Sequence, residues 1–296
     1  LGLIKRNTEE IIGEEELEEL LKRKKEIKHY IGFEISGKIH LGTGLMCMLK
    51  VKDFMSAGIN CSVFLADWHS WINNKLDGTL ETARRLAKDY FEEAIKAAYI
   101  CVGGDPQDLK FVLGSELYDE SYWPKVIAIA KATTISRMMR STDIMGRIAG
   151  DSSEVATLFY PAMQAADIFQ MGINIAHAGT DQRNVHIVAR DAAKNLKQEK
   201  PVAIHHHLIL GLLKPDVFPP DKEAMKMSKS KPDSAVFIHD SPEEIKRKVN
   251  NAFAPEGEID YNPVLDWTKY LVFYEEGSSL SIIRIIEHGG NVTYSS

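Results

Sequence analysis

The chain has 296 residues, of which 44% are hydrophobic and 26% are charged, and its formal net charge is −6. This composition is typical of a globular protein with a sizeable core, and the acidic balance argues against a protein that coats nucleic acid through bulk charge. No apolar run has the length of a membrane span, no signal-peptide pattern is present, and the three cysteines lack metal or disulfide spacing. We therefore expect a cytoplasmic protein without a structural metal.

The first predicted elements are a helix and a strand. Residues 14–25 are interpreted as a solvated helix, because acidic residues crowd its start and basic residues its end, as the helix dipole favours. Residues 30–33 are interpreted as a strand, because Ile31 and Phe33 alternate onto one face. The strand is expected to end at Ser36-Gly37, where glycine permits the positive φ of a tight turn.

A helix start after this turn is the first candidate ligand site. The helix is expected to open at His40, and Gly42 leaves room for a ligand to approach the backbone. Unpaired backbone N–H groups point out of a first helical turn, so this position favours an anion. The expected apolar side of the helix consists of Leu41, Leu45, Leu49 and Met48.

Strands and helices then alternate. Residues 61–67 form a continuous apolar run that is typical of a strand buried on both faces, Thr79 begins an amphipathic helix, and residues 110–113 read as a further strand. This alternation predicts an α/β fold with a doubly wound parallel sheet. The helical pattern over residues 116–147 fits a segment inserted into that sheet.

A second strand–glycine–helix element follows. After a helix over residues 152–172 and a strand over 173–177, the stretch 178–183 turns into the next helix. In open α/β sheets, ligands bind in the crevice at the carboxyl ends of the strands, so the two turns are expected to face one ligand site. A strand over residues 202–213 carries three consecutive histidines, which alternate between its faces and cannot jointly bind one metal.

Two lysines three residues apart, Lys226 and Lys229, lie in a small polar segment. Alone they are most simply a solvated loop, but together with the anion site at His40 they predict a mobile clamp for a triphosphate. Ser241 then caps a helix that runs to about residue 253, with Pro242 at its first position. The remaining residues are interpreted as a small C-terminal module.

Two motifs carry a resemblance to class I aminoacyl-tRNA synthetases. Lys226-Met227-Ser228-Lys229-Ser230 matches the Lys-Met-Ser-Lys-Ser signature of that class, and His40-Leu41-Gly42-Thr43 resembles its His-Ile-Gly-His signature. Thr43 departs from the second pattern, since threonine replaces the second histidine.

Within that class the chain is similar to tyrosyl-tRNA synthetases of the archaeal type. The resemblance rests on the stretches 30–42, Leu65-Ala-Asp-Trp-His69, Tyr160-Pro-Ala-Met-Gln164-Ala-Ala-Asp167 and Gly179-Thr-Asp-Gln-Arg183. It implies a Rossmann-like catalytic domain over residues 1–240, with an inserted helical dimerisation segment at about 116–150. It also implies a homodimer and a partial C-terminal anticodon-binding module over 241–296.

The resemblance assigns roles by position. It implies catalytic roles for His40, Lys226 and Lys229. The residues that it places on tyrosine are Tyr30, Tyr160, Gln164, Asp167 and Gln182, with Tyr30 and Asp167 on the phenolic hydroxyl. The residues that it places on ATP are Gly32, Gly42, Thr43, Gly179, Asp181, Met227, Ser228 and Ser230. For Asp167 the residues agree, because a carboxylate in an apolar surround is costly without a partner; His69 is either a pocket residue or a structural histidine.

The implied reaction is the activation of tyrosine with ATP, accompanied by Mg²⁺, and the transfer of tyrosyl to the 3′ end of tRNA(Tyr), with no membrane partner. Three alternatives stay open at this point. A tryptophanyl-tRNA synthetase shares the fold and signatures, although a pair of hydroxyl partners fits tyrosine better. The others are a catalytically inactive synthetase-derived RNA-binding protein and a small-molecule adenylyltransferase.

Overall fold

The computed structural model describes residues 1–23, 26–145, 154–216 and 225–296. These residues divide into two compact units. Unit 1 contains Leu1–Ile39 and Cys47–His207, and unit 2 contains His40–Met46 and Leu208–Ser296. Each unit is described separately below.

Unit 1 is built on one six-stranded sheet. Its strands are β1 (Thr8–Ile12), β2 (Lys28–Glu34), β3 (Asn60–Ala66), β4 (Lys110–Leu113), β5 (Ile175–Gly179) and β6 (Val202–His206). Their order in the sheet is β1-β6-β5-β2-β3-β4. The pairs from β6 to β4 are parallel, and β1 joins the edge of β6 antiparallel. The predicted parallel sheet is thereby confirmed.

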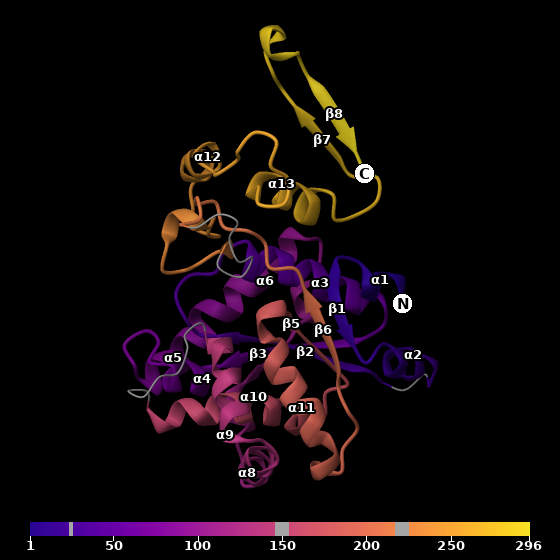
Figure 1. The fold of residues 1–296 in the computed structure, drawn as a ribbon, viewed down its shortest axis with the longest axis vertical. Coiled ribbons are helices and arrows are strands. Elements are labelled where there is room, and N and C mark those ends of the chain that lie inside the picture. Colours follow the sequence, from indigo (N-terminus) through magenta and orange to yellow (C-terminus); the bar gives the residue numbers. More distant parts are fainter. Residues whose placement is uncertain (24–25, 146–153, 217–224) are drawn as a thin grey trace. The chain divides into compact units, whose positions relative to one another are not determined.

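Helices cover both faces of this sheet (Figure 1). On β2, His29 packs against Phe54 of α3, with ring centroids 4.5 Å apart, whereas the next residue, Tyr30, belongs to the buried cluster formed with α10. Because successive strand residues point to opposite faces, α3 and α10 lie on opposite sides, as in a doubly wound fold. The helices of unit 1 are α1 (Gly2–Lys5), α2 (Glu14–Lys22), α3 (Cys47–Ser56), α4 (Asp67–Ile72), α5 (Leu80–Leu86), η2 (Ala87–Glu92), α6 (Glu93–Cys101), η3 (Pro106–Asp108), α7 (Gly114–Leu117), α8 (Tyr122–Ala132), α9 (Ile135–Arg140), η4 (Ser141–Met145), η5 (Val155–Leu158), α10 (Phe159–Gln170), η6 (Thr180–Gln182) and α11 (Arg183–Leu196).

The helices α8, α10 and α11 supply much of the core on one face. Val126 and Ile129 of α8, Met163 and Ile168 of α10 and Val188 of α11 are buried together with Phe64 of the sheet. Each such side chain contributes on the order of 1.5–3 kcal/mol through removal from water. This packing fixes α10 and α8 against the strands that carry the candidate site.

Several predicted elements differ in detail. The helix after the glycine turn starts with a π-helical turn, η1 (Gly42–Met46), and continues as α3. Its expected apolar side was wrong in part: Met48 is buried as expected, but Leu41, Leu45 and Leu49 are only partly buried. The other buried residues are Met46, Val51 and Phe54. The wider π turn rotates the following residues, which moves the buried stripe.

Lys50 of α3 is fully buried, which its sequence position did not indicate. Its Nζ donates to the carbonyl oxygens of Leu3, Ile4 and Arg6, at 3.2, 2.6 and 2.6 Å. These carbonyls end the short helix α1, so the ammonium caps it and fastens the N-terminal segment to α3.

Unit 2 brings the segment around His40 together with a stretch far away in the sequence. His40 pairs with Phe237 in an antiparallel bridge, and the Leu41 N–H donates to the Val236 carbonyl at 3.0 Å. Met46 is buried in a cluster with Ile209, Met227, Ala235 and Phe237. The remaining elements of unit 2 are η8 (Pro232–Ser234), α12 (Pro242–Asn250), α13 (Pro263–Trp267), η9 (Thr268–Val272), η10 (Ile286–His288) and the hairpin of β7 (Ser279–Ile282) and β8 (Val292–Ser295).

The predicted cap of α12 is confirmed, because the Ser241 hydroxyl accepts a hydrogen bond from the Glu244 N–H and Pro242 takes the first helical position. The end of the helical stretch predicted over 116–147 and the first two residues of the helix predicted over 152–172 lie outside the described residues. Within the described part of the chain, no helix is long and apolar enough to cross a membrane.

Candidate active site

The sheet of unit 1 changes winding direction between β2 and β5. The chain passes from β2 to β3 and β4 on one side, and from β5 to β6 on the other, while β2 and β5 are parallel neighbours. The crevice at the carboxyl ends of two such strands is the usual ligand position in this architecture. Glu34 ends β2 and Gly179 ends β5, so the residues that the sequence motifs singled out lie at this edge.

Asp167 is the most deeply buried of the predicted tyrosine ligands, with no exposed surface. The Tyr122 hydroxyl donates to Asp167 Oδ1 at 2.8 Å. The second oxygen, Oδ2, has no hydrogen-bond partner among the described residues, and the Nε2 of His69 lies 3.6 Å from it. A buried polar atom without a partner is costly, so Oδ2 indicates a position where a ligand donor or acceptor binds.

Tyr30 faces the same pocket from β2. Burial raises its pKa, and the nearby Asp167 carboxyl raises it further. Burial also raises the pKa of Asp167 well above its usual range, while burial lowers that of His69 to about 3. These groups therefore favour uncharged forms, and a neutral hydroxyl suits them better than a charged ligand group.

Gly32 keeps the middle of β2 open. It is exposed although its neighbours Ile31 and Phe33 are buried, and a Cβ there would lie 3.6 Å from the rings of Tyr30 and Phe64. Glycine inside a strand commonly marks a place where a ligand approaches the backbone. The accessible backbone at Gly32 thus lies beside Tyr30, on the side of the sheet that α10 covers.

The other predicted tyrosine ligands form a polar group next to this pocket. The Gln164 side-chain amide donates to the Gln182 side-chain oxygen at 3.1 Å, and Gln182 in turn donates to the Ile144 carbonyl at 3.2 Å. The Tyr160 hydroxyl donates to Glu34 Oε1 at 3.4 Å, and its ring lies against His69 with centroids 4.6 Å apart. Amide oxygens and a carboxylate are acceptors that suit an ammonium group.

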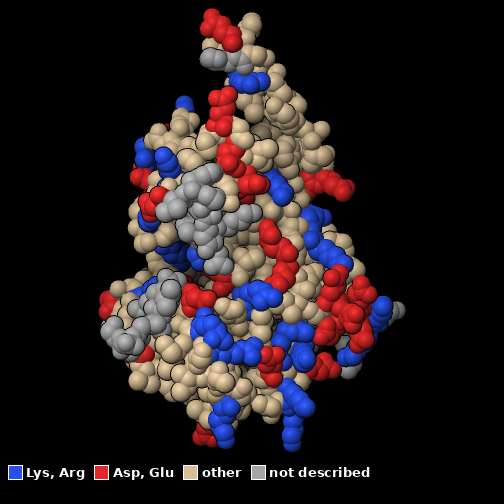
Figure 2. All heavy atoms as spheres, in the orientation of Figure 1, with Lys and Arg blue, Asp and Glu red and all other residues tan. Residues whose placement is uncertain are grey.

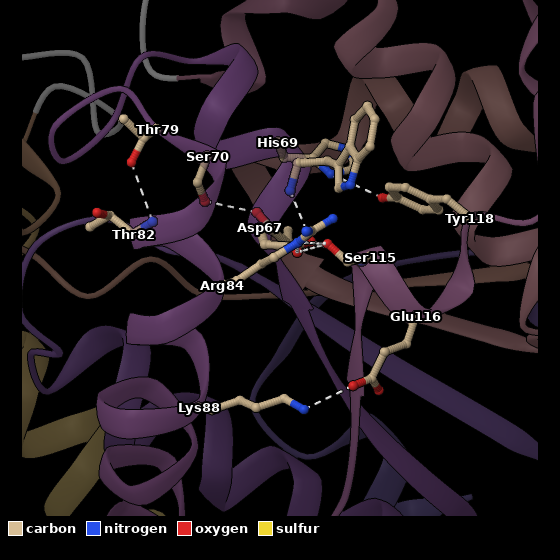
Figure 3. A network of polar contacts seen from close by, with 12 residues as sticks. Asp67, His69, Ser70, Thr79, Thr82, Arg84, Lys88, Ser115, Glu116 and Tyr118 are labelled. Atoms are coloured by element: carbon tan, nitrogen blue, oxygen red, sulfur yellow. Dashed lines mark hydrogen bonds and ion pairs between the residues drawn. The ribbon is translucent and has the colours of Figure 1, made fainter.

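A network of polar contacts at the ends of β3 and β4 holds α4, which carries His69, in place (Figure 3). The buried carboxylate of Asp67 accepts from the Trp68 N–H at 2.9 Å and from the Ser115 N–H at 3.1 Å. Its other oxygen accepts from the Ser115 hydroxyl and contacts Arg84 at 3.5 Å. The start of α4 is thereby tied to α7, and the Tyr118 hydroxyl reaches to 3.4 Å from Nδ1 of His69.

Asp181, the predicted ribose ligand, begins just past β5 in η6 and is partly buried. Burial lowers the pKa of His206 and raises that of Cys47, and the Asp181 carboxylate favours a higher pKa at both groups. Nδ1 of His206 lies 2.8 Å from Nε2 of His177. His205 faces a different set of partners, His186 at 2.9 Å and Glu10 at 2.9 Å. The consecutive histidines thus have separate structural partners.

In unit 2, His40 is held by its own turn. Its Nδ1 accepts from the Thr43 N–H at 3.4 Å, and the Thr43 hydroxyl interacts with the His40 backbone at 3.2 Å. Burial, followed by the charge of Lys229, lowers the His40 pKa to about 3. The neutral ring therefore carries its proton on Nε2, which makes this atom a donor suited to a phosphate oxygen. A Cβ at Gly42 would lie 3.2 Å from the imidazole, so glycine is needed for this ring position.

The Lys226–Ser230 loop belongs to the same unit as His40. Lys226 pairs with Leu210 in an antiparallel bridge, the Ser228 N–H donates to the Ser234 hydroxyl at 3.0 Å, and the Ser228 and Ser230 hydroxyls lie 2.8 Å apart. Met227 is buried in the apolar cluster, so its side chain anchors the loop, and any contact with a nucleotide would come from its backbone. The structure thus places the two signature motifs together.

Sequence reasoning missed Tyr118, Tyr122 and Glu34. Tyrosines in a helical segment usually indicate core packing, and nothing local showed that two of them reach Asp167 and His69. Glu34 was detectable in principle, because a carboxylate at the end of an apolar strand needs a partner. Asn73 supplies one, donating to Glu34 Oε1 at 2.6 Å.

The chain matches the family model described as tRNA synthetases class I (W and Y) over residues 22–290. It is 52% identical to the tyrosine–tRNA ligase of Thermococcus sibiricus, over 97% of this chain and 81% of that protein. It is 51% identical to the tyrosine–tRNA ligase of Pyrococcus abyssi, over 99% and 83%. The crystal structure of tyrosyl-tRNA synthetase complexed with L-tyrosine from Pyrococcus horikoshii superposes with a TM-score of 0.95 at 49% identity, covering 100% of this chain and 85% of that one.

The chain therefore belongs to the class I tRNA synthetases, with the Rossmann-like fold of that class. Within the class it belongs with the tyrosine–tRNA ligases, and its function is that of an aminoacyl-tRNA synthetase which ligates tyrosine to tRNA. The tryptophanyl-tRNA synthetase of Aeropyrum pernix, at 22% identity and a TM-score of 0.71, shares the fold.

Proposed function

We propose that the chain carries out the ligation in two steps. Tyrosine first reacts with ATP to give tyrosyl-adenylate and pyrophosphate, and the tyrosyl group is then transferred to the 3′ end of tRNA(Tyr). In this proposal, the predicted tyrosine ligands bind the amino acid, and the residues of the two signature motifs act on the phosphates. The chemistry needs little covalent participation by the protein, so positioning and charge stabilisation supply most of the rate.

The observation that carries the proposal is the unpaired Oδ2 of Asp167. The phenolic hydroxyl of tyrosine is both a donor and an acceptor, so it satisfies this oxygen and the Tyr30 hydroxyl together. A phenyl ring would leave both buried groups without partners, and an indole, which has a donor but no acceptor, could pair with only one of them. The pocket thus supports tyrosine over other aromatic amino acids.

The polar group beside the pocket fits the α-amino end of the substrate. Three side chains offer acceptor oxygens to the substrate's ammonium group: Tyr160, Gln164 and Gln182. The Tyr160 hydroxyl donates its proton to the Glu34 carboxylate, so its own oxygen can accept from the ammonium. Asp181, two residues after Gly179, accepts hydrogen bonds from the ribose hydroxyls. Gly32 leaves room for the nucleotide over the middle of β2.

The residues that are proposed to contact the phosphates belong to the two signature motifs. His40 donates from Nε2 to a phosphate oxygen, and Lys226 and Lys229 stabilise the charge of the departing pyrophosphate. The hydroxyls of Ser228 and Ser230, which lie 2.8 Å apart, are additional hydrogen-bonding groups. Mg²⁺ enters with ATP as part of the substrate, and the described residues contain no cluster of three or more His, Cys, Asp or Glu side chains that could hold a metal.

Exposed apolar side chains support the proposal of a homodimer. They lie on α8, α9, η5 and the start of α10: Trp123 37%, Ile127 48%, Ile135 76%, Met139 39%, Val155 75% and Phe159 39%. Figure 2 shows a broad area without charged side chains at the lower left, where α9 lies in Figure 1. A patch of this kind on a folded unit is typical of a protein interface, and a second copy of the inserted segment is its proposed partner.

Residues 241–296 are proposed to contact tRNA as part of an anticodon-binding module, with residues 1–240 as the catalytic domain. The proposed compartment is the cytoplasm. None of the three cysteines, all within the described residues, is in a disulfide, which fits a reducing compartment.

Amino-acid-dependent pyrophosphate exchange with all twenty amino acids tests the proposed reaction. Exchange that depends on tyrosine, with all other amino acids near background, is the expected result. Exchange with none of them would mean that the chain does not activate an amino acid. Exchange driven by tryptophan would mean that its substrate is tryptophan and not tyrosine. Charging of tRNA transcripts with labelled tyrosine then tests the second step.

A further inference from the structure

A buried tyrosine outside the predicted ligand set contacts Asp167 directly. Tyr122 of α8 has no exposed surface, and its ring stacks on that of Tyr118 with centroids 4.0 Å apart. Its hydroxyl lies 2.8 Å from Asp167 Oδ1 and 3.1 Å from the Met163 carbonyl oxygen. A hydroxyl has one proton to donate, and the shorter of the two contacts is the one to the carboxyl.

This contact differentiates the two oxygens of the carboxyl. Oδ1 is occupied by the Tyr122 hydroxyl, whereas Oδ2 has no hydrogen-bond partner in the described part of the chain. A carboxyl group held at one oxygen loses this shorter hydrogen bond when it rotates away. The orientation of Oδ2 is therefore fixed before any ligand arrives.

The ring wall around Tyr122 prevents alternative positions for its hydroxyl. Besides Tyr118, the ring of Trp123 packs edge-on against Tyr122 with centroids 5.4 Å apart. The backbone N–H of Tyr122 donates to the Asp119 backbone oxygen and to its carboxylate, each at 3.1 Å, which fixes the first turn of α8. The donor is thus preorganised by contacts that do not involve the substrate.

We propose that Tyr122 is a positioning residue for the selection of tyrosine over phenylalanine: its hydroxyl holds Asp167 so that Oδ2 is presented to the phenolic hydroxyl of the substrate. This inference rests on the proposed function of Asp167 and names a part of the chain that does not touch the substrate. Its effect passes through Asp167 alone. Removing the Tyr122 hydroxyl therefore weakens tyrosine selection while the ring packing stays.

The test compares Tyr122→Phe with the parent protein in pyrophosphate exchange, using tyrosine and phenylalanine separately. The measured quantity is the ratio of kcat/KM for the two amino acids. Loss of one hydrogen bond to a buried carboxyl predicts a fall of this ratio by about tenfold or more, through tyrosine and not through phenylalanine. Because both values come from one preparation, the ratio does not depend on the folded fraction.

Tyr99→Phe is the matched control. Tyr99 is also buried in unit 1, and its hydroxyl contacts Met55 Sδ at 2.8 Å, so its removal should leave the ratio unchanged. The change Tyr122→Phe is also made in the Asp167→Ala background. If Tyr122 acts through Asp167, it has no further effect on the ratio there.

An unchanged ratio in Tyr122→Phe would overturn the inference, and so would a fall that persists in the Asp167→Ala background. If Tyr122→Phe yields no folded protein, Tyr122→His replaces it, since the shorter imidazole does not reach Oδ1 and the same fall is expected. A parent protein without tyrosine-dependent exchange would instead refute the proposed function, so the two failures are distinguishable.

Discussion

Asp167 and Tyr30 are the residues on which substrate choice depends most directly. Asp167→Ala removes the unpaired Oδ2, and Tyr30→Phe removes one hydroxyl while keeping the ring. We expect tyrosine activation to fall strongly in the first variant and more mildly in the second, with phenylalanine activation little changed or raised. Tyrosyl-tRNA synthetases are the standard example of discrimination by roughly 10⁴ to 10⁵ against phenylalanine, and we take this magnitude over from the family as the parent value.

The measurement is again the ratio of kcat/KM for the two amino acids. If the assignment is right, Asp167→Ala loses most of the discrimination between tyrosine and phenylalanine. If both variants keep the parent ratio, the hydroxyl of the substrate binds elsewhere, and the pocket assignment fails.

Lys226 and Lys229 give a second test at the level of single residues. If they stabilise pyrophosphate as it departs, their contribution appears mainly in the transition state. Lys226→Ala and Lys229→Ala should each slow adenylate formation by roughly 10²- to 10³-fold, as expected for loss of one preorganised electrostatic contact. Tyrosine affinity, measured by equilibrium binding without ATP, should stay at the parent value. Unchanged single-turnover activation would exclude the assignment.

Sequence reasoning named the residues that are proposed to act and missed those that hold them. Lys226 and Asp167 were detectable because a signature motif or an apolar surround gives a local signal. Tyr122 gives no such signal, since its role depends on a contact across 45 residues of sequence. Thr43 is intermediate: its position in the motif was visible, but its bonds to His40 were not.

Among the elements, the segment 210–212 supports the signature loop through a glycine. Gly211 donates to the Met225 carbonyl at 2.5 Å. A Cβ at Gly211 would lie 3.0 Å from that oxygen, 3.1 Å from the Ser234 oxygen and 3.2 Å from the Lys226 oxygen. Three backbone groups cannot all move aside cheaply, so any side chain here displaces the loop.

Gly211→Ala should therefore slow adenylate formation on the order of tenfold to hundredfold with both lysines still present, because small misplacements of catalytic groups are costly. Gly2→Ala is the control, since a Cβ there has nothing within 4 Å. The measurement is the single-turnover rate of adenylate formation in the two variants. Equal rates would show that the loop tolerates displacement.

The elements themselves were predicted unevenly. The strands β3 and β4 were found within a residue of their observed bounds, because apolar runs such as the one in β3, which is buried on both faces, are a strong local signal. β1 was missed: its stretch Thr8-Glu-Glu-Ile-Ile has no clear alternation, and it becomes a strand only by pairing with β6, almost 200 residues later. Pairing of this range has no signature in the local sequence.

For the whole molecule, the inserted segment predicts self-association. Ile127→Glu combined with Ile135→Glu places charges in the apolar patch and should convert a dimer into a monomer in analytical ultracentrifugation. Ile100→Glu is the matched control, because Ile100 of α6 is 56% exposed and lies outside the patch. A parent protein that sediments as a monomer, or a double variant that remains dimeric, would contradict the proposed interface.

Buried histidines predict a loss of stability in acid. Burial lowers the pKa of His29 and His69 to about 3 and that of His206 to about 4, from 6.5, and lowers those of His177 and His186 well below it. Below pH 6.5 the unfolded chain binds more protons than the folded one, so the free energy of unfolding falls as pH decreases towards 4. Each such histidine costs about 1 kcal/mol between pH 7.5 and 5.5.

Urea unfolding at several pH values measures this loss as a falling midpoint. The raised pKa values of Asp67 and Asp167 act in the opposite direction, but two carboxyls do not offset five histidines. In His29→Phe the dependence should be weaker by about 1 kcal/mol, since one titrating group is gone. A midpoint that does not change with pH would show that the folded and unfolded chains bind protons equally, which contradicts the lowered pKa values.

The division of the chain has a consequence for how such a protein can be varied by recombination. His40–Met46 belongs to unit 2, although the sequence on both sides of it belongs to unit 1. Met46 is covered by Ile209, Met227 and Phe237, all encoded far downstream. A single crossover between two related genes near codon 207 would combine His40–Met46 of one parent with the residues of the other parent that cover Met46. Functional chimeras of this family should therefore inherit the short segment and the C-terminal part from the same parent.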